Sequence, residues 1–195
     1  MKKDKVVIGI FGKIGTGKSL VAEILSRKYG FSHINVDKIG HCVLAEKKKK
    51  IVSVFGSKIL DKEGNIDRKI LGDIVFLDPE KNFLLTSIVH PIMKKKIEGI
   101  VKDSKENRFV IDAALLFEIG LDEFSDFLIK VEAPEKLIFE RVRATKGWND
   151  KKIKMVLKRQ AYIDLLGRRA DFIIFNNAGV DKIEKQIDFF MNVIF

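Results

Sequence analysis

An eight-residue run near the start of the chain, Gly12-Lys13-Ile14-Gly15-Thr16-Gly17-Lys18-Ser19, has the spacing of a phosphate-binding loop, or P-loop. Its glycines let the backbone curl so that several N–H groups point at one anion. Lys18 adds a positive charge for the β- and γ-phosphates of a nucleotide, and Ser19 offers a hydroxyl to Mg²⁺. The run and the next residue therefore form the predicted nucleotide site: Gly12, Gly15, Thr16, Gly17, Lys18, Ser19 and Leu20, with Ser19 as the metal ligand.

The residues on either side of this loop have the patterns of a strand and a helix. Val6 to Phe11 form a short apolar run, typical of a buried parallel strand. Apolar residues at helical spacing follow Ser19, and Gly30 is a suitable stop. A glycine-rich turn without a ligand is the alternative. The order strand, loop, helix favours the phosphate site.

Five strand patterns separated by helical stretches predict an α/β fold: a five-stranded parallel sheet with helices on both faces. Ligands of such sheets bind at the carboxyl ends of the strands, so functional residues are expected just past those ends. The predicted strands are 6–11, 33–36, 109–113, 127–131 and 172–175.

Two long intervals interrupt the strand pattern. Roughly seventy residues separate the second and third strands, far more than an ordinary crossover needs. They carry helical patterns at 43–55, 69–76 and 83–101 and a turn at Leu60–Asn65, which suggests a helical substrate-binding insertion at 41–107. The second interval, 141–169, is helical and rich in Arg and Lys. It suits a lid over phosphates, or else a plain pair of crossover helices. The core is then 1–40, 108–140 and 170–195.

Two carboxylates follow strand patterns and are candidates for catalysis. Asp37 comes directly after the second strand, where a carboxylate can accept a hydroxyl proton or orient the hydroxyl for attack. A helix N-cap is the competing role for Asp37. Asp112 ends the third strand, the position of an acidic residue that holds Mg²⁺ directly or through water. The alternative for Asp112 is a partner of Lys18 or of substrate.

Polar residues beyond the last two strands suit a purine. The Arg141 guanidinium could stack on a base or meet phosphate, or form a surface ion pair with Glu140. Asn176 and Asn177 end the fifth strand and offer amides to the adenine edge, although Asn is also common in turns. His90 precedes Pro91 within an apolar helical stretch, which favours a packing or capping role over a catalytic one.

Composition and charge narrow the class of protein. A chain of 195 residues, 46% hydrophobic and 33% charged, predicts a soluble globular domain. No apolar stretch approaches the ~20 residues of a membrane helix, and a lone cysteine with no leader pattern predicts a cytoplasmic location. The net charge of +10 would allow nucleic acid as a partner. The basic residues are scattered, however, and the run Lys47-Lys48-Lys49-Lys50 reads as a solvated helix face or a phosphate-attracting surface.

These motifs together resemble the dephospho-coenzyme A kinase family along nearly the whole chain. The P-loop is shared by many kinases, and the other segments are more specific. They are Val36-Asp37-Lys38-Ile39, Asn65-Ile66-Asp67-Arg68, Val75-Phe76-Leu77-Asp78-Pro79-Glu80, His90-Pro91-Ile92, Asp112-Ala113-Ala114-Leu115-Leu116-Phe117-Glu118, Gln160, Ala170-Asp171 and Asn176-Asn177.

The resemblance implies ATP-dependent phosphorylation of the ribose 3′-hydroxyl of dephospho-CoA, with Mg²⁺, as the last step of coenzyme A synthesis. It implies that Asp37 is the base or orienting group, that Lys18 and Asp112 act with it, and that the insertion binds the CoA moiety. It also implies that Arg141 and the Asn176-Asn177 loop lie near adenine. Further expected substrate contacts are His41, His90, Leu115 and Phe117.

The chain departs from the family pattern at several positions. Lys13 stands where a second Gly is usual, Leu20 replaces a Thr, and His41 replaces a frequent Arg. Lid positions that are usually basic hold Thr145, Val156 and Leu166. A kinase of a nucleoside or nucleotide, and a nucleic-acid-binding ATPase, are the alternative functions. The scattered charge speaks against the ATPase, and no membrane or nucleic-acid partner is expected.

Overall fold

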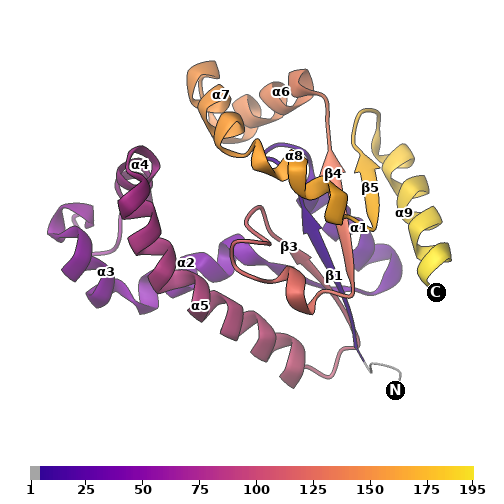
Figure 1. Ribbon diagram of the computed structural model, residues 1–195, viewed down its shortest axis with the longest axis horizontal. Coiled ribbons are helices and arrows are strands. Elements are labelled where there is room, and N and C mark those ends of the chain that lie inside the picture. Colours follow the sequence, from indigo (N-terminus) through magenta and orange to yellow (C-terminus); the bar gives the residue numbers. More distant parts are fainter. Residues whose placement is uncertain (1–4) are drawn as a thin grey trace. The chain divides into compact units, whose positions relative to one another are not determined.

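The computed structural model describes residues 5–195, which form two compact units (Figure 1). The first contains residues 5–35 and Ser104–Phe195, and the second is Val36–Asp103. The second unit holds most of the predicted insertion at 41–107. Among the described residues, no helix combines the length and apolar character needed to cross a membrane.

The first unit is built on a five-stranded parallel sheet in the order β2-β3-β1-β4-β5, so the predicted α/β class is confirmed. Because the central strands are buried on both faces, they read in the sequence as continuous apolar runs. Two predicted strands have the observed bounds, two are shifted by one residue along the chain, and one is a residue too short. The strands are β1 Val6–Phe11, β2 Ser32–Asn35, β3 Arg108–Asp112, β4 Phe127–Glu132 and β5 Phe172–Phe175.

One face of this sheet packs on helices α1, Lys18–Tyr29, and α9, Val180–Ile194. Their apolar residues join those of β1, β4 and β5 in one buried cluster, which includes Ile10, Ile24, Ile129 and Ile187. Helix α1 ends at Gly30, whose φ of 69° is the left-handed conformation of a helix C-cap. The predicted stop at Gly30 is therefore confirmed.

The other face of the sheet carries Phe11 and Lys130 and meets the segment after β3. The Phe117 ring lies edge-on to Phe11, at 4.9 Å between ring centroids. The short helix α8, Tyr162–Leu166, leads to Gly167, which lies close to the Lys130 side chain. Between β4 and α8 come α6, Glu135–Lys146, and α7, Asp150–Arg159, which share a small apolar cluster. The first unit also contains the single-turn helices η2, Asp122–Phe124, and η3, Gly167–Arg169.

The second unit is helical: α2 Val36–Glu46, α3 Lys48–Phe55, η1 Ser57–Ile59, α4 Arg68–Leu77 and α5 Pro79–Asp103. Val36 was predicted to end a strand and instead begins α2. It is β-branched, and the first turn of a helix buries its side chain as well as a strand would. The helix predicted at 43–55 is two helices divided at Lys47. Val43, Ile51 and Phe55 are all buried at helical spacing, so periodicity does not reveal the break.

Local side-chain chemistry sets the remaining boundaries of this unit. Asp67 caps α4 by accepting hydrogen bonds from the backbone N–H groups of Lys69 and Ile70. The predicted turn closes with Leu60 paired to Ile66, while Asp61 accepts backbone bonds within it. Pro91 lies inside α5. A proline there removes one helical hydrogen bond.

Candidate active site

The P-loop joins β1 to α1 and leaves the start of α1 available to an anion. Gly17 is the N-cap residue at φ 97°, no side chain caps the helix, and its first turn has no acidic residue. The first N–H groups of α1 and the positive end of its dipole are thus set for a phosphate. A Cβ on Gly17 would collide with the Asn176 amide, so glycine is required there by both conformation and space.

Inside the loop, the carbonyl of Lys13 gathers two side chains. It accepts a hydrogen bond from Thr16 Oγ1 at 2.9 Å and one from Lys18 Nζ at 3.2 Å. Thr16 is buried, and the Leu20 side chain packs against the core of the first unit. The loop therefore keeps its curled shape through its own polar groups.

Two residues from distant elements hold the loop from outside. The buried Asn176 donates from Nδ2 to the carbonyl of Thr16 at 2.8 Å. Arg141 donates to Asn176 Oδ1 at 2.9 Å and to the carbonyl of Gly15 at 3.4 Å. Asn177, the next residue, is exposed. The two predicted adenine-side residues Arg141 and Asn176 are thus brought to the P-loop, where they support its backbone.

Ser19 and Asp112 form the predicted metal side of the site. Ser19 Oγ donates to Asp112 Oδ2 at 2.6 Å, which joins the start of α1 to the end of β3. His33 on β2 has its Nε2 3.8 Å from the same carboxylate oxygen. Burial raises the pKa of Asp112, but His33, Ser19 and the charge of Lys18 more than offset this, so the pKa is lowered. Asp112 is therefore a carboxylate at neutral pH, as an oxygen ligand for a cation must be.

The second unit carries two predicted site residues on one helix. Asp37 is exposed in the first turn of α2, two residues beyond Asn35, which pairs with Asp112 in the sheet. His41 lies one helical turn later, and its Nδ1 accepts from Arg68 at 2.8 Å. Partial burial and the Arg68 charge lower the pKa of His41. His41, but not Asp37, lines a hollow of about 330 Å³, together with Leu44, Ala45, Lys48, Asn65, Ile66 and Arg68.

The other predicted substrate contacts have different surroundings. Leu115 is exposed in the segment after β3. Phe117 is half-buried between Phe11 and Arg169, whose guanidinium lies 4.7 Å from the centre of the Phe117 ring. His90 is half-buried in the middle of α5 in the second unit.

Sequence reasoning assigned no role to three residues that contact or adjoin the loop. Gln160 accepts a hydrogen bond from the backbone N–H of Ile14 at 2.8 Å, and Asp164 pairs with Lys13 at 2.6 Å. Lys130 is buried in β4 beside them. The available signal was a lysine within the apolar run of the predicted strand 127–131. A buried lysine needs an acidic partner, so this position indicates an ion pair near the site.

Fold and site together define a class. A parallel sheet, a P-loop at the head of α1 and an acidic residue ending the neighbouring strand β3 are the parts of a P-loop kinase. Comparison with known proteins identifies the family within this class. The family model for dephospho-CoA kinase matches residues 6–182. The chain therefore belongs to the dephospho-CoA kinase family and is an enzyme of the kinase class.

Individual relatives agree with this assignment. Dephospho-CoA kinase of Borreliella burgdorferi is 36% identical, over 96% of this chain and 94% of the relative. The Aquifex aeolicus protein of the same name is 38% identical, over 92% and 93%. Among solved structures, dephospho-CoA kinase from Campylobacter jejuni superposes with a TM-score of 0.69 at 32% identity, covering 96% of both chains. A shikimate kinase from Acinetobacter baumannii, at 14% identity and TM-score 0.59 over 99% and 97%, shares the fold.

Proposed function

We propose that this protein transfers the γ-phosphoryl group of ATP to the ribose 3′-hydroxyl of dephospho-CoA, giving coenzyme A. The observation that carries the proposal is the P-loop, with its anion-ready helix start joined through Ser19 to Asp112, in a chain of this family. The lone cysteine, Cys42, agrees with a cytoplasmic enzyme.

On the donor side, the P-loop and the first turn of α1 hold the phosphates. The residues assigned to this work are Gly12, Gly15, Thr16, Gly17, Lys18, Ser19 and the backbone of Leu20. Arg141 uses its N–H groups on Gly15 and Asn176, and the flat face of its guanidinium is assigned to the adenine ring. The exposed amide of Asn177 is assigned to the polar edge of the base.

The donor set at Ser19 and Asp112 fits Mg²⁺. A hydroxyl and an ionised carboxylate in contact at 2.6 Å are the hard oxygen groups that this ion takes, directly or through water. Bound there, the ion would neutralise charge on the β- and γ-phosphates. Lys18 adds a positive charge on the same side of the site as Asp112, since this charge contributes to the lowered pKa of Asp112.

On the acceptor side, Asp37 is assigned to the 3′-hydroxyl. Its carboxylate follows β2 by two residues, so the chain carries it past the carboxyl end of a strand paired with β3. There it would orient the hydroxyl and accept its proton as the phosphoryl group is transferred. His41, His90, Leu115 and Phe117 are the assigned CoA contacts, the insertion 41–107 binds the CoA moiety, and 141–169 is the lid.

The test measures ADP release with ATP and Mg²⁺ on addition of dephospho-CoA, nucleoside monophosphates or DNA in turn. We expect stimulation by dephospho-CoA alone, and a product carrying the new phosphate on the 3′-oxygen by ³¹P NMR. Activity should disappear when a chelator removes Mg²⁺ and return when it is restored. Stimulation by a nucleoside monophosphate or by DNA, with none by dephospho-CoA, would replace the proposal with one of those functions.

A further inference from the structure

The first half of the P-loop is tied to the junction of α7 and α8. Lys13 Nζ lies 2.6 Å from Asp164 Oδ2 in α8, and the backbone N–H of Ile14 donates to Gln160 Oε1 at the end of α7. Lys13 and Ile14, which are adjacent in the loop, therefore contact Asp164 and Gln160, which lie four residues apart in the predicted lid. Both contacts belong to the first unit.

A buried lysine stands behind Asp164. Lys130 is only 5% exposed, and its Nζ lies 2.6 Å from Glu132 Oε1 and 3.9 Å from Asp164 Oδ1. A buried ammonium is costly without carboxylate partners, and Glu132 and Asp164 supply such partners to Lys130. A Cβ at residue 167 would lie 2.8 Å from Lys130 Nζ, so Gly167 leaves room for the lysine.

These four charged residues lie around a small cavity, which Glu135 also lines. Lys13, Glu132, Lys130 and Asp164 all line it, together with the buried Thr16 of the loop, and its volume is about 200 Å³. Asp164 lies between the two ammonium groups, and its carboxylate pairs with Lys13. The position of the Lys13 side chain is thus determined by a residue of α8.

Lys13 also connects this cluster to the phosphate-binding lysine. Its carbonyl accepts the hydrogen bonds of Lys18 Nζ and Thr16 Oγ1, while its side chain pairs with Asp164. One residue therefore joins the α8 carboxylate to the peptide group that orients Lys18. Holding such a group in place lowers the cost of ordering it when a nucleotide binds.

We propose that Asp164 is a positioning residue for nucleotide binding, which acts through Lys13 on the P-loop peptide that orients Lys18 and is itself held by Lys130. It touches no reacting atom. The inference rests on the proposed function only in that the loop binds ATP. It predicts that Asp164 changes affinity for the nucleotide and leaves affinity for the acceptor unchanged.

The test is a double-mutant cycle with Lys13→Met, Asp164→Asn and both together. Calorimetry gives the Kd for AMP-PNP with Mg²⁺ and no acceptor, so the result is independent of which hydroxyl is phosphorylated. We expect each single variant to raise the Kd about fivefold, since an ion pair with an exposed partner is weak. The double variant should be no worse than either single one. Asp164→Glu should restore most of the affinity, and 1 M salt should shrink the difference.

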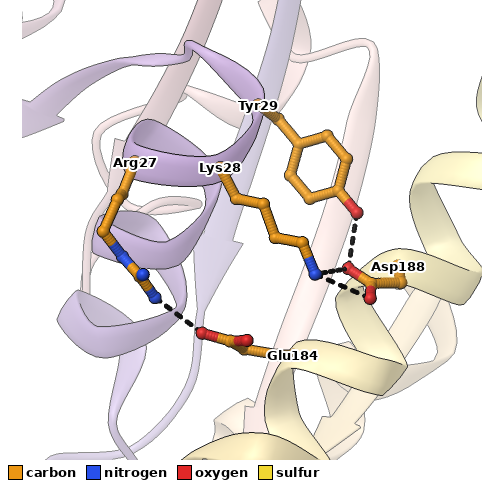
Figure 2. Close-up of polar contacts among 5 residues, drawn as sticks. All are labelled: Arg27, Lys28, Tyr29, Glu184 and Asp188. Atoms are coloured by element: carbon orange, nitrogen blue, oxygen red, sulfur yellow. Dashed lines mark hydrogen bonds and ion pairs between the residues drawn. The ribbon is translucent and has the colours of Figure 1, made fainter.

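A matched control uses another lysine–aspartate pair of the same length. Lys28 Nζ lies 2.6 Å from Asp188, between α1 and α9 (Figure 2). Asp188→Asn should lower the free energy of unfolding and leave the Kd for AMP-PNP unchanged. The proposal is overturned if Asp164→Asn binds AMP-PNP like the parent, if the two single effects simply add, or if Asp188→Asn weakens binding equally. Loss of acceptor phosphorylation with the cycle intact would count against the proposed function alone.

Discussion

The P-loop and the helical unit Val36–Asp103 present their polar groups in opposite ways. The loop is held by residues from α6, from the end of α7, and from the segment after β5. Thr16 of the loop is buried, and so is Asn176, which donates to its carbonyl. In the helical unit, Asp37 and His41 are exposed on one helix, and His41 accepts a hydrogen bond from Arg68 of the same unit. The first region relies on backbone shape, and the second on individual side chains.

The difference teaches where a substitution should act. In the loop, we expect peptide N–H groups to meet phosphate beside the Lys18 and Ser19 side chains, so changes that move the backbone should matter there. On α2, a single carboxylate can be replaced without disturbing the helix that carries it. Side-chain substitutions should therefore affect catalysis in the helical unit, and nucleotide binding and stability at the loop.

The largest effect is expected from Asp37→Asn, which preserves size and removes the proton acceptor. We expect kcat to fall by about 10²–10⁴-fold, the usual contribution of a positioned base, while the KM for ATP stays within about twofold. Steady-state rates with dephospho-CoA check this. Glu98→Gln, an exposed carboxylate variant on α5, is the control and should keep the parent rate. A normal rate for Asp37→Asn would remove Asp37 from the mechanism.

The next effect concerns loop shape and compares two glycines of positive φ. Gly17→Ala places a Cβ against the Asn176 amide, whereas Gly147→Ala meets nothing within 4 Å. Both variants carry the strain of a left-handed alanine, about 1–3 kcal/mol, which denaturant unfolding measures. Only Gly17→Ala should also weaken ATP binding, by about tenfold or more. Equal behaviour of the two would mean that the contact with Asn176 does not shape the loop.

A smaller effect is expected from Asn176→Ala. The change removes the amide that donates to the Thr16 carbonyl and accepts from Arg141. The Thr16 carbonyl and the Arg141 guanidinium then stay partly desolvated without that partner. The free energy of unfolding should fall by about 1–3 kcal/mol, the cost of leaving a buried polar group unpaired. Asn177→Ala, at the exposed neighbour, should change stability by less than about 0.5 kcal/mol. Similar losses for both would show that burial of Asn176 contributes nothing to the loop.

The smallest effect is expected at Tyr29, the last residue of α1, whose hydroxyl donates to Asp188 of α9 (Figure 2). Partial burial and the hydrogen bond to Asp188 raise the pKa of Tyr29 to about 12. The folded state therefore favours the protonated phenol, so this contribution is present below pH 10 and is lost as the pH rises toward 12. Tyr29→Phe should lower stability slightly at pH 8, and the difference should vanish at pH 12. A stability difference between the parent and Tyr29→Phe that persists at pH 12 would show that it comes from packing of the side chain.

Several elements could be predicted because their signals are local. The P-loop spacing, the apolar strand runs and the stop at Gly30 each depend on residues within a few positions of one another. The division between α2 and α3 was missed because Lys47 interrupts the helix without breaking the spacing of Val43 and Ile51. Arg141 and Asn176 were placed near the nucleotide, but their hydrogen bonds to Gly15 and Thr16 could not be anticipated.

The amino-acid sequence by itself determined the parallel α/β fold, the phosphate loop and the family, because these depend on short-range pattern and motif. Tertiary structure decided what holds the loop: Asn176 on Thr16, Gln160 on Ile14, and Asp164 on Lys13 with the buried Lys130 behind it. Lys13 and Asp164 are 151 residues apart along the chain, and no local pattern links them. The packing of the chain brings them together, because a buried lysine and a curled loop both require partners that only the folded chain supplies.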